Sequence, residues 1–496
     1  MTTTEPAADG HRPVGNVPPR SLADTESATD PGGARRGVTR LSRDRAGGGH
    51  GAALSGRLAD PSAGAGGGVP PQAAPAQTVV PQAVPLPAPQ QRVRTARDAG
   101  GVEQREQRII RALFAAGLTT FASMYSAQAL LPSLSAAFGV TPAHAALAVS
   151  LTTGVLALAI VPVSALSSRV GRTRVMIGSA VLASGLGLLL PLCGSLDALL
   201  AVRAAQGLAL AGVPAVAMAY LAEEIGGASL GAAMGVYVAG TSVGGLAGRL
   251  IPSFTLALGS WRWAEAAVSI AAAGCAIWFV KTLPPSRGFV ARPAGFRTVL
   301  GDLAAQLRDR RLAALFGLAF VLMGSFVSVY NFLGYRLTQR PFDLPAAVAG
   351  SIFVLYLAGT AASALAGRLA DRRGHHRVLS VSVLLMGAGL ACTIPDRLIV
   401  IIPGVLLFTF GFFAAHAVAS AWVGALAVQR GAASSLYLFA YYLGSAVVGS
   451  AAGIAYAAAG WAGVMCAVAA LFTIAALLLG VLARGGARSE PAYDRH

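Results

Sequence analysis

The sequence predicts an all-α membrane protein with twelve transmembrane helices, arranged as two similar bundles of six. Three observations support this fold class. Hydrophobic residues make up 55% of the 496-residue chain and charged residues only 12%, about half of the charged fraction of an ordinary soluble domain. Long apolar runs alternate with brief polar breaks from about residue 110 onward. Short motifs also recur about 205 positions apart, which indicates a duplicated unit.

The segment 1–108 precedes the first apolar run and is rich in Pro, Gly, Ala and Ser. A segment of this composition buries too little apolar surface to offset the entropy lost on ordering, so we predict a disordered tail. No short apolar stretch of the kind found in secretory signals follows Met1. We therefore expect the tail to lie in the cytoplasm.

Twelve apolar runs of 18 to 32 residues follow, and a helix needs about 20 residues to cross the hydrocarbon core. Strands of a membrane β-barrel are about 10 residues long with alternating polarity, so helices are favoured. The N-terminal bundle, within 109–283, is predicted to contain the spans 112–134, 144–166, 175–194, 198–222, 230–257 and 261–283. After a basic linker at 284–311, the C-terminal bundle, within 312–483, is predicted to contain the spans 312–335, 345–368, 378–395, 397–428, 432–457 and 459–483. Residues 484–496 are expected to form a cytoplasmic C-terminal tail.

The charge distribution predicts the orientation of the spans. The net charge is +17, and the basic residues fall in short bursts between the apolar runs. This distribution is typical of a membrane protein and excludes a soluble nucleic-acid binder, which would carry a basic stripe on one face. The arginine-rich loops, the linker and both termini share one side of the predicted spans, and the positive-inside rule places that side in the cytoplasm. We expect a monomer in the inner membrane, in contact with lipid and not with nucleic acid.

Other kinds of chemistry find no support. The four cysteines lie in separate apolar stretches, without the spacing of a metal site or a disulfide framework. The stretch GASLG at 227–231 matches a hydrolase motif, but that motif needs a strand before it and a soluble sheet beneath it. The sequence has no Walker loop and no HExxH motif. We therefore expect no enzyme activity, no metal and no cofactor.

The motif repeat explains the two bundles. LSSRVGRTR at 166–174 and LADRRGHHR at 369–377 share one skeleton, and FASMY at 121–125 resembles FVSVY at 326–330. Three glycine pairs lie at similar separations: Gly207 with Gly411, Gly244 with Gly449, and Gly248 with Gly453. Two related bundles around a site near the midplane are typical of secondary transporters, because two nearly balanced packings open the site alternately to each side.

The loop motif resembles a signature of the major facilitator superfamily, Gly-x-x-x-Asp-Arg-x-Gly-Arg-Arg, and the resemblance covers about residues 110–483. The first-half copy has serine where the signature has its first glycine and its aspartate. The matching residues are Arg169, Gly171 and Arg172 in the first half, and Gly367, Asp371, Arg372, Gly374 and Arg377 in the second. The resemblance implies that these loops latch a cytoplasmic gate. It also implies the twelve-helix major facilitator fold.

Two further signatures narrow the resemblance. Arg-x-x-Gln-Gly on the fourth span is intact, as Arg203, Gln206 and Gly207. The glycine pattern of proton antiporters on the fifth span is matched, with two departures, by Gly231, Gly240, Gly244, Gly245, Gly248 and Arg249. With YSAQALLP at 125–132 and SWRW at 260–263, the chain resembles the YnfM-like branch of inner-membrane efflux permeases. The resemblance implies export of a small molecule driven by the proton gradient; the alternative is an importer or facilitator of a sugar or organic acid.

Two arginines within the spans are candidate functional residues. A buried arginine is costly in lipid unless it is paired or hydrated, so Arg203 is a candidate for proton coupling or substrate contact. Its alternative role is structural, as half of an ion pair or as a donor to helix carbonyls. For Arg249 we expect either a contact with Glu265 on the next span or an extension toward the membrane surface.

Uncharged groups complete the candidate site. On the first and seventh spans these are Tyr125, Gln128, Tyr330 and Asn331, which are able to hydrogen-bond a substrate or a neighbouring helix. His416 on the tenth span is either a proton relay or a structural residue. The small residues at 240, 244 and 248 form a stripe at helical spacing, which predicts close packing of a neighbouring helix.

Overall fold

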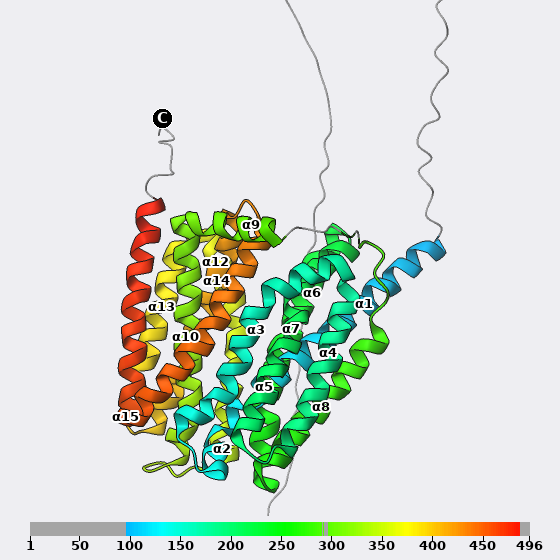
Figure 1. Ribbon diagram of the computed structural model, residues 1–496. Helices are drawn as coiled ribbons and strands as arrows, with labels where there is room; N and C mark the ends of the chain where they lie inside the picture. Colours follow the sequence, from blue (N-terminus) through cyan, green and yellow to red (C-terminus); the bar gives the residue numbers. More distant parts are fainter. Residues whose placement is uncertain (1–95, 290, 292–295, 487–496) are drawn as a thin grey trace, which may run out of the picture. The chain divides into compact units, whose positions relative to one another are not determined.

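The computed structural model describes residues 96–289, 291 and 296–486. The described regular structure is entirely helical. Long helices lie side by side in this part of the chain, with α9 at one end of the bundle and α2 at the other (Figure 1). The predicted tail falls mostly outside the described residues, as do residues 487–496.

The first half runs from α1 to α8. Its long helices follow the predicted first six spans in order, with the first and fourth spans each broken into two helices. The elements are α1 (Ala96–Tyr125), η1 (Gln128–Leu130), α2 (Leu131–Phe138), α3 (Pro142–Val170), α4 (Arg172–Leu189), η2 (Leu190–Leu192), α5 (Leu196–Leu210), α6 (Gly212–Glu224), α7 (Gly227–Thr255), η3 (Leu256–Leu258) and α8 (Trp261–Thr282).

The second half follows the linker and repeats the pattern of long helices. Its eighth span is again composite, because a short helix and a 3-10 turn precede α12. The elements are α9 (Phe296–Arg308), α10 (Arg310–Thr338), α11 (Ala346–Gly350), η4 (Ser351–Tyr356), α12 (Leu357–Arg373), α13 (His375–Ala391), α14 (Leu398–Leu426) and α15 (Arg430–Gly486).

The helix lengths are consistent with twelve spans. Among the described residues, 10 helical segments are long and apolar enough to cross a membrane. One of these segments is α15, which contains two helices because its backbone is non-helical at Ala459 and Gly460. The helix α13 adds a further segment of 17 residues at the predicted ninth span, at the short end of the usual range for a transmembrane helix.

Two element boundaries differ from the sequence prediction. Whereas the tail is predicted to reach residue 108, α1 begins at Ala96, because Ala, Glu, Gln and Arg are strong helix formers that extend the first span. The predicted linker also contains a helix, α9, which begins at Phe296 and ends at Arg308. Gln429 Nε2 donates to the carboxylate of Asp302 on α9 over 3.0 Å, so this helix contacts the second half.

The glycine stripe packs α7 directly onto α1. Cβ atoms added at Gly240, Gly244 and Gly248 would lie 2.5–2.6 Å from backbone carbonyl oxygens of α1. The same close approach recurs in the second half, where a Cβ added at Gly444 would collide with the carbonyl oxygen of Phe320 on α10. Each half therefore contains a pair of helices whose backbones touch, as small residues allow in membrane bundles.

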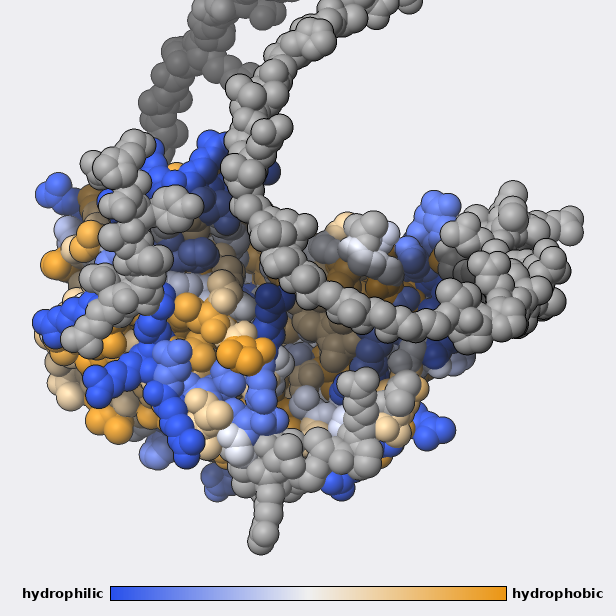
Figure 2. All heavy atoms as spheres, turned by 90° about the horizontal axis from the view of Figure 1, so that it is seen from above, coloured by the Kyte–Doolittle hydropathy of each residue, from blue (hydrophilic) through white to orange (hydrophobic). Residues whose placement is uncertain are grey.

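Hydrogen bonds join the two halves near the α2 end. The hydroxyl of Tyr335 on α10 lies 2.6 Å from the hydroxyl of Ser135 and donates to the carbonyl of Leu131 over 2.8 Å. Helix α3 also packs on α15, where a Cβ added at Gly453 would lie 2.7 Å from Cα of Ala143. At the opposite end, hydrophilic side chains surround a hollow with a partly hydrophobic floor (Figure 2).

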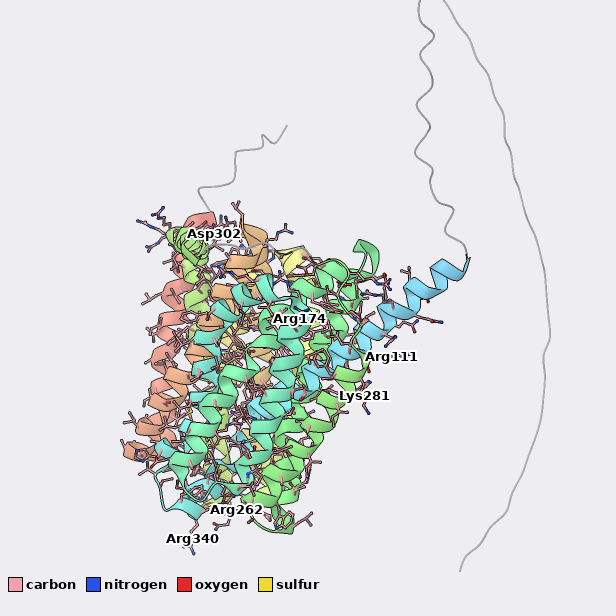
Figure 3. All side chains as sticks on the ribbon, turned by 45° about the vertical axis from the view of Figure 1, so that its right-hand side comes forward. Arg111, Arg174, Arg262, Lys281, Asp302 and Arg340 are labelled. Carbon is pink, nitrogen blue, oxygen red and sulfur yellow. The ribbon has the colours of Figure 1, made fainter. Side chains whose placement is uncertain are left out.

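Charged side chains mark both ends of the described bundle. Asp302 lies at the α9 end, and Arg262 and Arg340 lie at the α2 end (Figure 3). This placement agrees with the polar breaks expected between the spans.

Candidate functional site

The guanidinium of Arg203 binds the broken end of α1. Arg203 lies on α5 and is fully buried. Its Nη1 donates to the carbonyl of Ser123 over 2.9 Å, its Nη2 to that of Met124 over 2.8 Å, and its Nε to that of Ala148 over 2.8 Å. Because α1 ends at Tyr125, the carbonyls of its last turn have no donors from their own helix. Arg203 supplies these donors and places a positive charge at the negative end of the helix dipole.

A serine hydroxyl connects Arg203 to a buried carboxylate. Nη1 of Arg203 also donates to Gln206 Oε1 over 2.8 Å and to Ser126 Oγ over 3.2 Å. Ser126 in turn donates to Glu265 Oε1 on α8 over 2.7 Å. Glu265 is only 3% exposed. The two opposite charges therefore share one hydroxyl, and the four side chains form a continuous polar network that we call the Arg203 network.

The predicted contact between Arg249 and Glu265 is wrong, and so is the predicted extension toward the membrane surface. Arg249 is 2% exposed on α7. Its Nε donates to Gln128 Oε1 over 2.6 Å, and its Nη1 donates to the carbonyl of Gly245. The reason is the rotation of α7, which directs Arg249 toward the break in the first span, while Glu265 is held by the Arg203 network.

Aromatic rings from both halves surround the Arg249 guanidinium. Its central carbon lies 3.9 Å from the ring centroid of Tyr125, 4.5 Å from that of Tyr356 and 5.6 Å from that of Phe353. Contacts at these distances stabilise a cation through the electron-rich faces of the rings. We call these four residues the Arg249 box. Tyr356 and Phe353 belong to the second half, so the box spans the contact between the halves.

The other candidates on the first and seventh spans meet beside this box. Gln128 Nε2 donates to Asn331 Oδ1 over 2.7 Å, which joins η1 to α10. The hydroxyl of Tyr330 lies 2.7 Å from the hydroxyl of Thr409 on α14. Both Gln128 and Asn331 are buried. The structure thus brings together Tyr125, Gln128, Tyr330, Asn331 and Arg249.

A cavity adjoins these residues near the α2 end. Its volume is about 260 Å³, and both halves line it. Gln128 and Pro132 contribute from the first half, and Tyr330, Gly334 and Phe353 from the second. A concave pocket with a few polar groups among apolar walls is the usual form of a small-molecule site.

His416 stands apart from both arginines. It lies on α14 and is half-buried. Its Nδ1 is 3.0 Å from the hydroxyl of Tyr437, and its ring contacts those of Phe412 and Tyr441. None of its described contacts reaches Arg203 or Arg249, so the structure does not join it to either group.

The two loop motifs differ in their contacts. In the first half, Arg172 pairs with Glu223 at 3.1 Å and donates to Ser167 Oγ over 2.6 Å. Gly171 and Gly374 both have positive φ, 112° and 85°, a conformation that glycine adopts without strain. Arg169 lies in the last turn of α3.

The second-half motif is open to solvent. Asp371, Arg372 and Arg377 are exposed, and their side chains make no hydrogen bond or ion pair with any described residue. Space is open around Gly367, where an added Cβ would meet no atom within 4 Å. The structure therefore does not join the two loop motifs, and their role as a latch stays a prediction.

Not all glycines of the antiporter pattern on α7 contact α1. The stripe described above contacts α1, but a Cβ at Gly231 would meet no atom within 4 Å. A Cβ added at Gly245 would meet no backbone atom of α1, and its nearest neighbours would be Nη1 of Arg249, at 3.3 Å, and the ring of Tyr125, at 3.9 Å. Only part of the pattern thus serves the α1–α7 contact.

Glu224, to which sequence reasoning assigned no role, anchors the start of the linker. Its Oε1 accepts hydrogen bonds from the Ser286 hydroxyl and from the backbone amides of Arg287, at 2.6 Å, and Gly288, at 2.8 Å. Its Oε2 pairs with Arg105 of α1 at 2.8 Å. We call residues 284–289 the strap. A carboxylate at a helix end is ordinarily solvated. The position of Glu224 near the end of the fourth span therefore does not indicate these contacts.

Two aromatic residues of the box were also missed. Phe353 and Tyr356 lie in η4, where the sequence predicts an ordinary stretch of the eighth span. Aromatic side chains in an apolar run carry no sign of which neighbour they face. The sequence predicts Glu265 only as a partner for Arg249, and its partner in the structure is Ser126.

Comparisons with known proteins agree with this architecture. The model of the Major Facilitator Superfamily matches residues 113–354 and 315–495. The chain is 43% identical over 376 residues to the inner membrane transport protein YnfM of Escherichia coli strain K12, covering 75% of this chain and 89% of that protein. It is 39% identical over 379 residues to the MFS-type transporter YybF of Bacillus subtilis strain 168, covering 76% of this chain and 94% of that protein.

Solved structures show the same fold. One is a bacterial homologue of the human lysosomal transporter Spinster, in an inward-facing and unoccupied conformation. Its TM-score is 0.62 at 15% sequence identity, and the match covers 79% of this chain and 99% of that one. The helical bundle, the family match and the two named relatives together establish the family and its YnfM-like branch. The chain is a multi-pass membrane protein that belongs to the major facilitator superfamily of transporters.

Proposed function

We propose that this protein exports a small molecule across the inner membrane in exchange for protons, as a monomer and without a cofactor. The observation that carries the proposal is the Arg203 network. It holds Glu265, which is 3% exposed and lies on the membrane-spanning helix α8. Among the described acidic residues, Glu224 also has a buried side chain, but Glu224 pairs directly with Arg105. Intramembrane ionisable groups mark proton and substrate pathways.

The proposed cycle follows from the position of this network. Ser126 lies between Arg203 and Glu265, at the break that separates α1 from η1. Protonation of Glu265 removes the charge that opposes Arg203, and the guanidinium then has only neutral partners. A proton drives transport when it binds one arrangement of the halves more tightly than the other. The break in the first span connects the network to the contact between the halves.

The arginine distribution supports the proposed orientation. The strap lies beside the basic loop between α3 and α4, where a Cβ added at Gly171 would be 4.0 Å from the ring of Phe289. The positive-inside rule places this end in the cytoplasm. The contacts between the halves at the α2 end would then close the site toward the outside, and the hollow at the α9 end would open toward the cytoplasm.

Transport is tested in liposomes that contain the purified protein and a pH-sensitive dye. An imposed proton gradient is monitored while pools of candidate compounds are added. We expect an active pool to collapse the gradient with the wild-type protein and not with Glu265→Gln, which keeps the size of the side chain and its hydrogen bond to Ser126. The matched control is Asp396→Asn, because Asp396 pairs with Arg336 and is 62% exposed.

The outcomes separate the alternatives. If Glu265→Gln still couples compound movement to protons, the assignment of the proton to Glu265 is wrong. If compounds move with the wild-type protein but no protons do, the protein is a facilitator. Accumulation of a compound together with protons, in the same direction, would identify an importer.

A further inference from the structure

Arg249 differs from the other buried arginines in its charge balance. The described residues include three buried arginines, Arg203, Arg249 and Arg336. Arg336 pairs with Asp396 at 2.7 Å, and Arg203 reaches Glu265 through one hydroxyl. Every described partner of Arg249 is neutral: an amide oxygen, a backbone carbonyl and aromatic rings. The contact between the halves therefore holds one positive charge without a fixed counter-charge.

An uncompensated guanidinium is expensive to keep in this position. A buried charge in a membrane protein is ordinarily paired or faces a water-filled space. Each ring contact contributes only about 0.5–2 kcal/mol, and the hydrogen bond to Gln128 leaves the net charge unchanged. The charge thus lies at a place where a neutral residue would pack more easily, and a transported anion would supply the missing negative charge.

Unpartnered polar atoms beside the box support the same ligand. Asn331 Nδ2 is buried and has no hydrogen-bond partner among the described residues, and the same holds for Ser150 Oγ. Both atoms would lie 3.5 Å from a Cβ added at Gly449, so they face one spot between the halves. Such orphaned groups are rare in native structures and call for a partner. Gln128 links Asn331 to Arg249, so these donors belong to the same polar cluster as the positive charge. Two donors and a cation in one cluster suit an oxygen-rich anion such as a carboxylate.

The walls of the site indicate the rest of the ligand. Tyr330 and Phe353 stack with their centroids 5.5 Å apart, and Tyr356 packs against Tyr330 at 4.8 Å. Both Tyr330 and Phe353 also line the cavity of about 260 Å³. This volume lies just below the range of about 300–1,000 Å³ that drug-sized ligands occupy. Flat aromatic walls and a small volume suit a molecule with one ring.

We propose that the Arg249 box binds the anionic group of the transported molecule, and that the substrates are small aromatic carboxylates. This inference rests on the proposed function for its transport step, but the binding step stands by itself. The charge of Arg249 selects the anion, Gln128 fixes the guanidinium, and the rings from the second half cover the aromatic body. Ligand binding then joins the two halves, since Arg249 and Tyr356 belong to different halves.

Binding is measured without transport, on the purified full-length protein in nanodiscs. The probes are three aromatic carboxylates and their neutral amides: benzoate with benzamide, phenylacetate with phenylacetamide, and cinnamate with cinnamamide. Each pair has nearly the same shape and differs in charge. We expect at least one acid to bind the wild-type protein about ten-fold more tightly than its amide, which is the preference that a charged hydrogen bond provides.

Substitutions test whether Arg249 causes the preference for the acid over the amide. Arg249→Gln should abolish the preference for the acid, whereas Arg249→Lys should keep part of it because the charge remains. The matched control is Arg262→Gln, since Arg262 also stacks on an aromatic ring, with its guanidinium 4.5 Å from Trp261, but lies on α8. Arg262→Gln should bind the acid as the wild type does. If Arg249→Gln fails to fold, Asn331→Ala serves in its place, and we expect it to weaken binding of the acid more than that of the amide.

The results distinguish this proposal from the proposed function. Equal binding of acids and amides to the wild-type protein, or no binding of any acid, would overturn the anion site. If Arg249→Gln still prefers the acid, the anion binds at another place, and the proposed site at Arg249 is wrong. If acids bind through Arg249 but do not move with protons in liposomes, the anion site stands and proton antiport fails.

Discussion

Replacing Glu224 by alanine should release the strap from the first half. The change removes the acceptor of three strap donors, the Ser286 hydroxyl and the backbone amides of Arg287 and Gly288. The strap is partly exposed, so water replaces the lost partner and the net contribution of each hydrogen bond applies, about 1 kcal/mol. The loss of about 3 kcal/mol corresponds to a roughly 150-fold larger population of the released strap.

Limited digestion with trypsin measures this population. Cleavage after Arg287 requires the strap to leave its site, and its rate follows the released population when release is fast compared with cleavage. The initial rate of cleavage at this bond is followed by mass spectrometry of the fragments. The matched control is Glu223→Ala, one residue away, because Glu223 pairs with Arg172 and makes no side-chain hydrogen bond to the strap. Equal cleavage rates in the two variants would refute the reasoning.

Three further changes test other parts of the structure. Gly244→Val places a Cβ 2.6 Å from an α1 carbonyl oxygen and should lower the free energy of unfolding by about 1–3 kcal/mol. Gly231→Val is the control, because a Cβ there meets no atom within 4 Å. Equal melting temperatures of the two variants would contradict the helix contact. Asp371→Asn should slow exchange in liposomes without changing the melting temperature, because Asp371 is exposed, and unchanged exchange would refute the latch. Tyr330→Phe loses the hydrogen bond to Thr409 and should lower the free energy of unfolding by about 1 kcal/mol, measured as a lower melting temperature. An unchanged melting temperature would show that this hydrogen bond does not stabilise the fold.

The spans were predictable because hydropathy reports directly on the membrane. A helix that crosses lipid needs a long apolar run whatever its neighbours are. For this reason, the predicted span at 312–335 corresponds to α10, which begins at Arg310 and ends at Thr338. The glycine stripe was predictable for a similar reason, since small residues at helical spacing allow close packing with any partner helix.

The side-chain partners were not predictable in the same way. Arg249 and Glu265 lie on consecutive spans, but their contact depends on how each helix is rotated about its axis, and an evenly apolar helix gives no sign of that rotation. Similarly, α9 is too polar for a span, and a short amphipathic helix in a basic linker resembles unstructured sequence. The hydrogen bond between Gln128 and Asn331 depends on how the two halves pack against each other, and local sequence does not determine that packing.

The break in the first span has a mechanical consequence. Above the break, α1 is bound to its own half through Arg203, which holds the carbonyls of Ser123 and Met124. Below it, α2 is bound to the opposite half through Tyr335. The first span thus connects the two halves, which must separate during a transport cycle, and each of its ends is bound to a different half. Either the hydrogen bonds of Tyr335 and Asn331 to this span break first, or the short segment between Met124 and Gln128 bends.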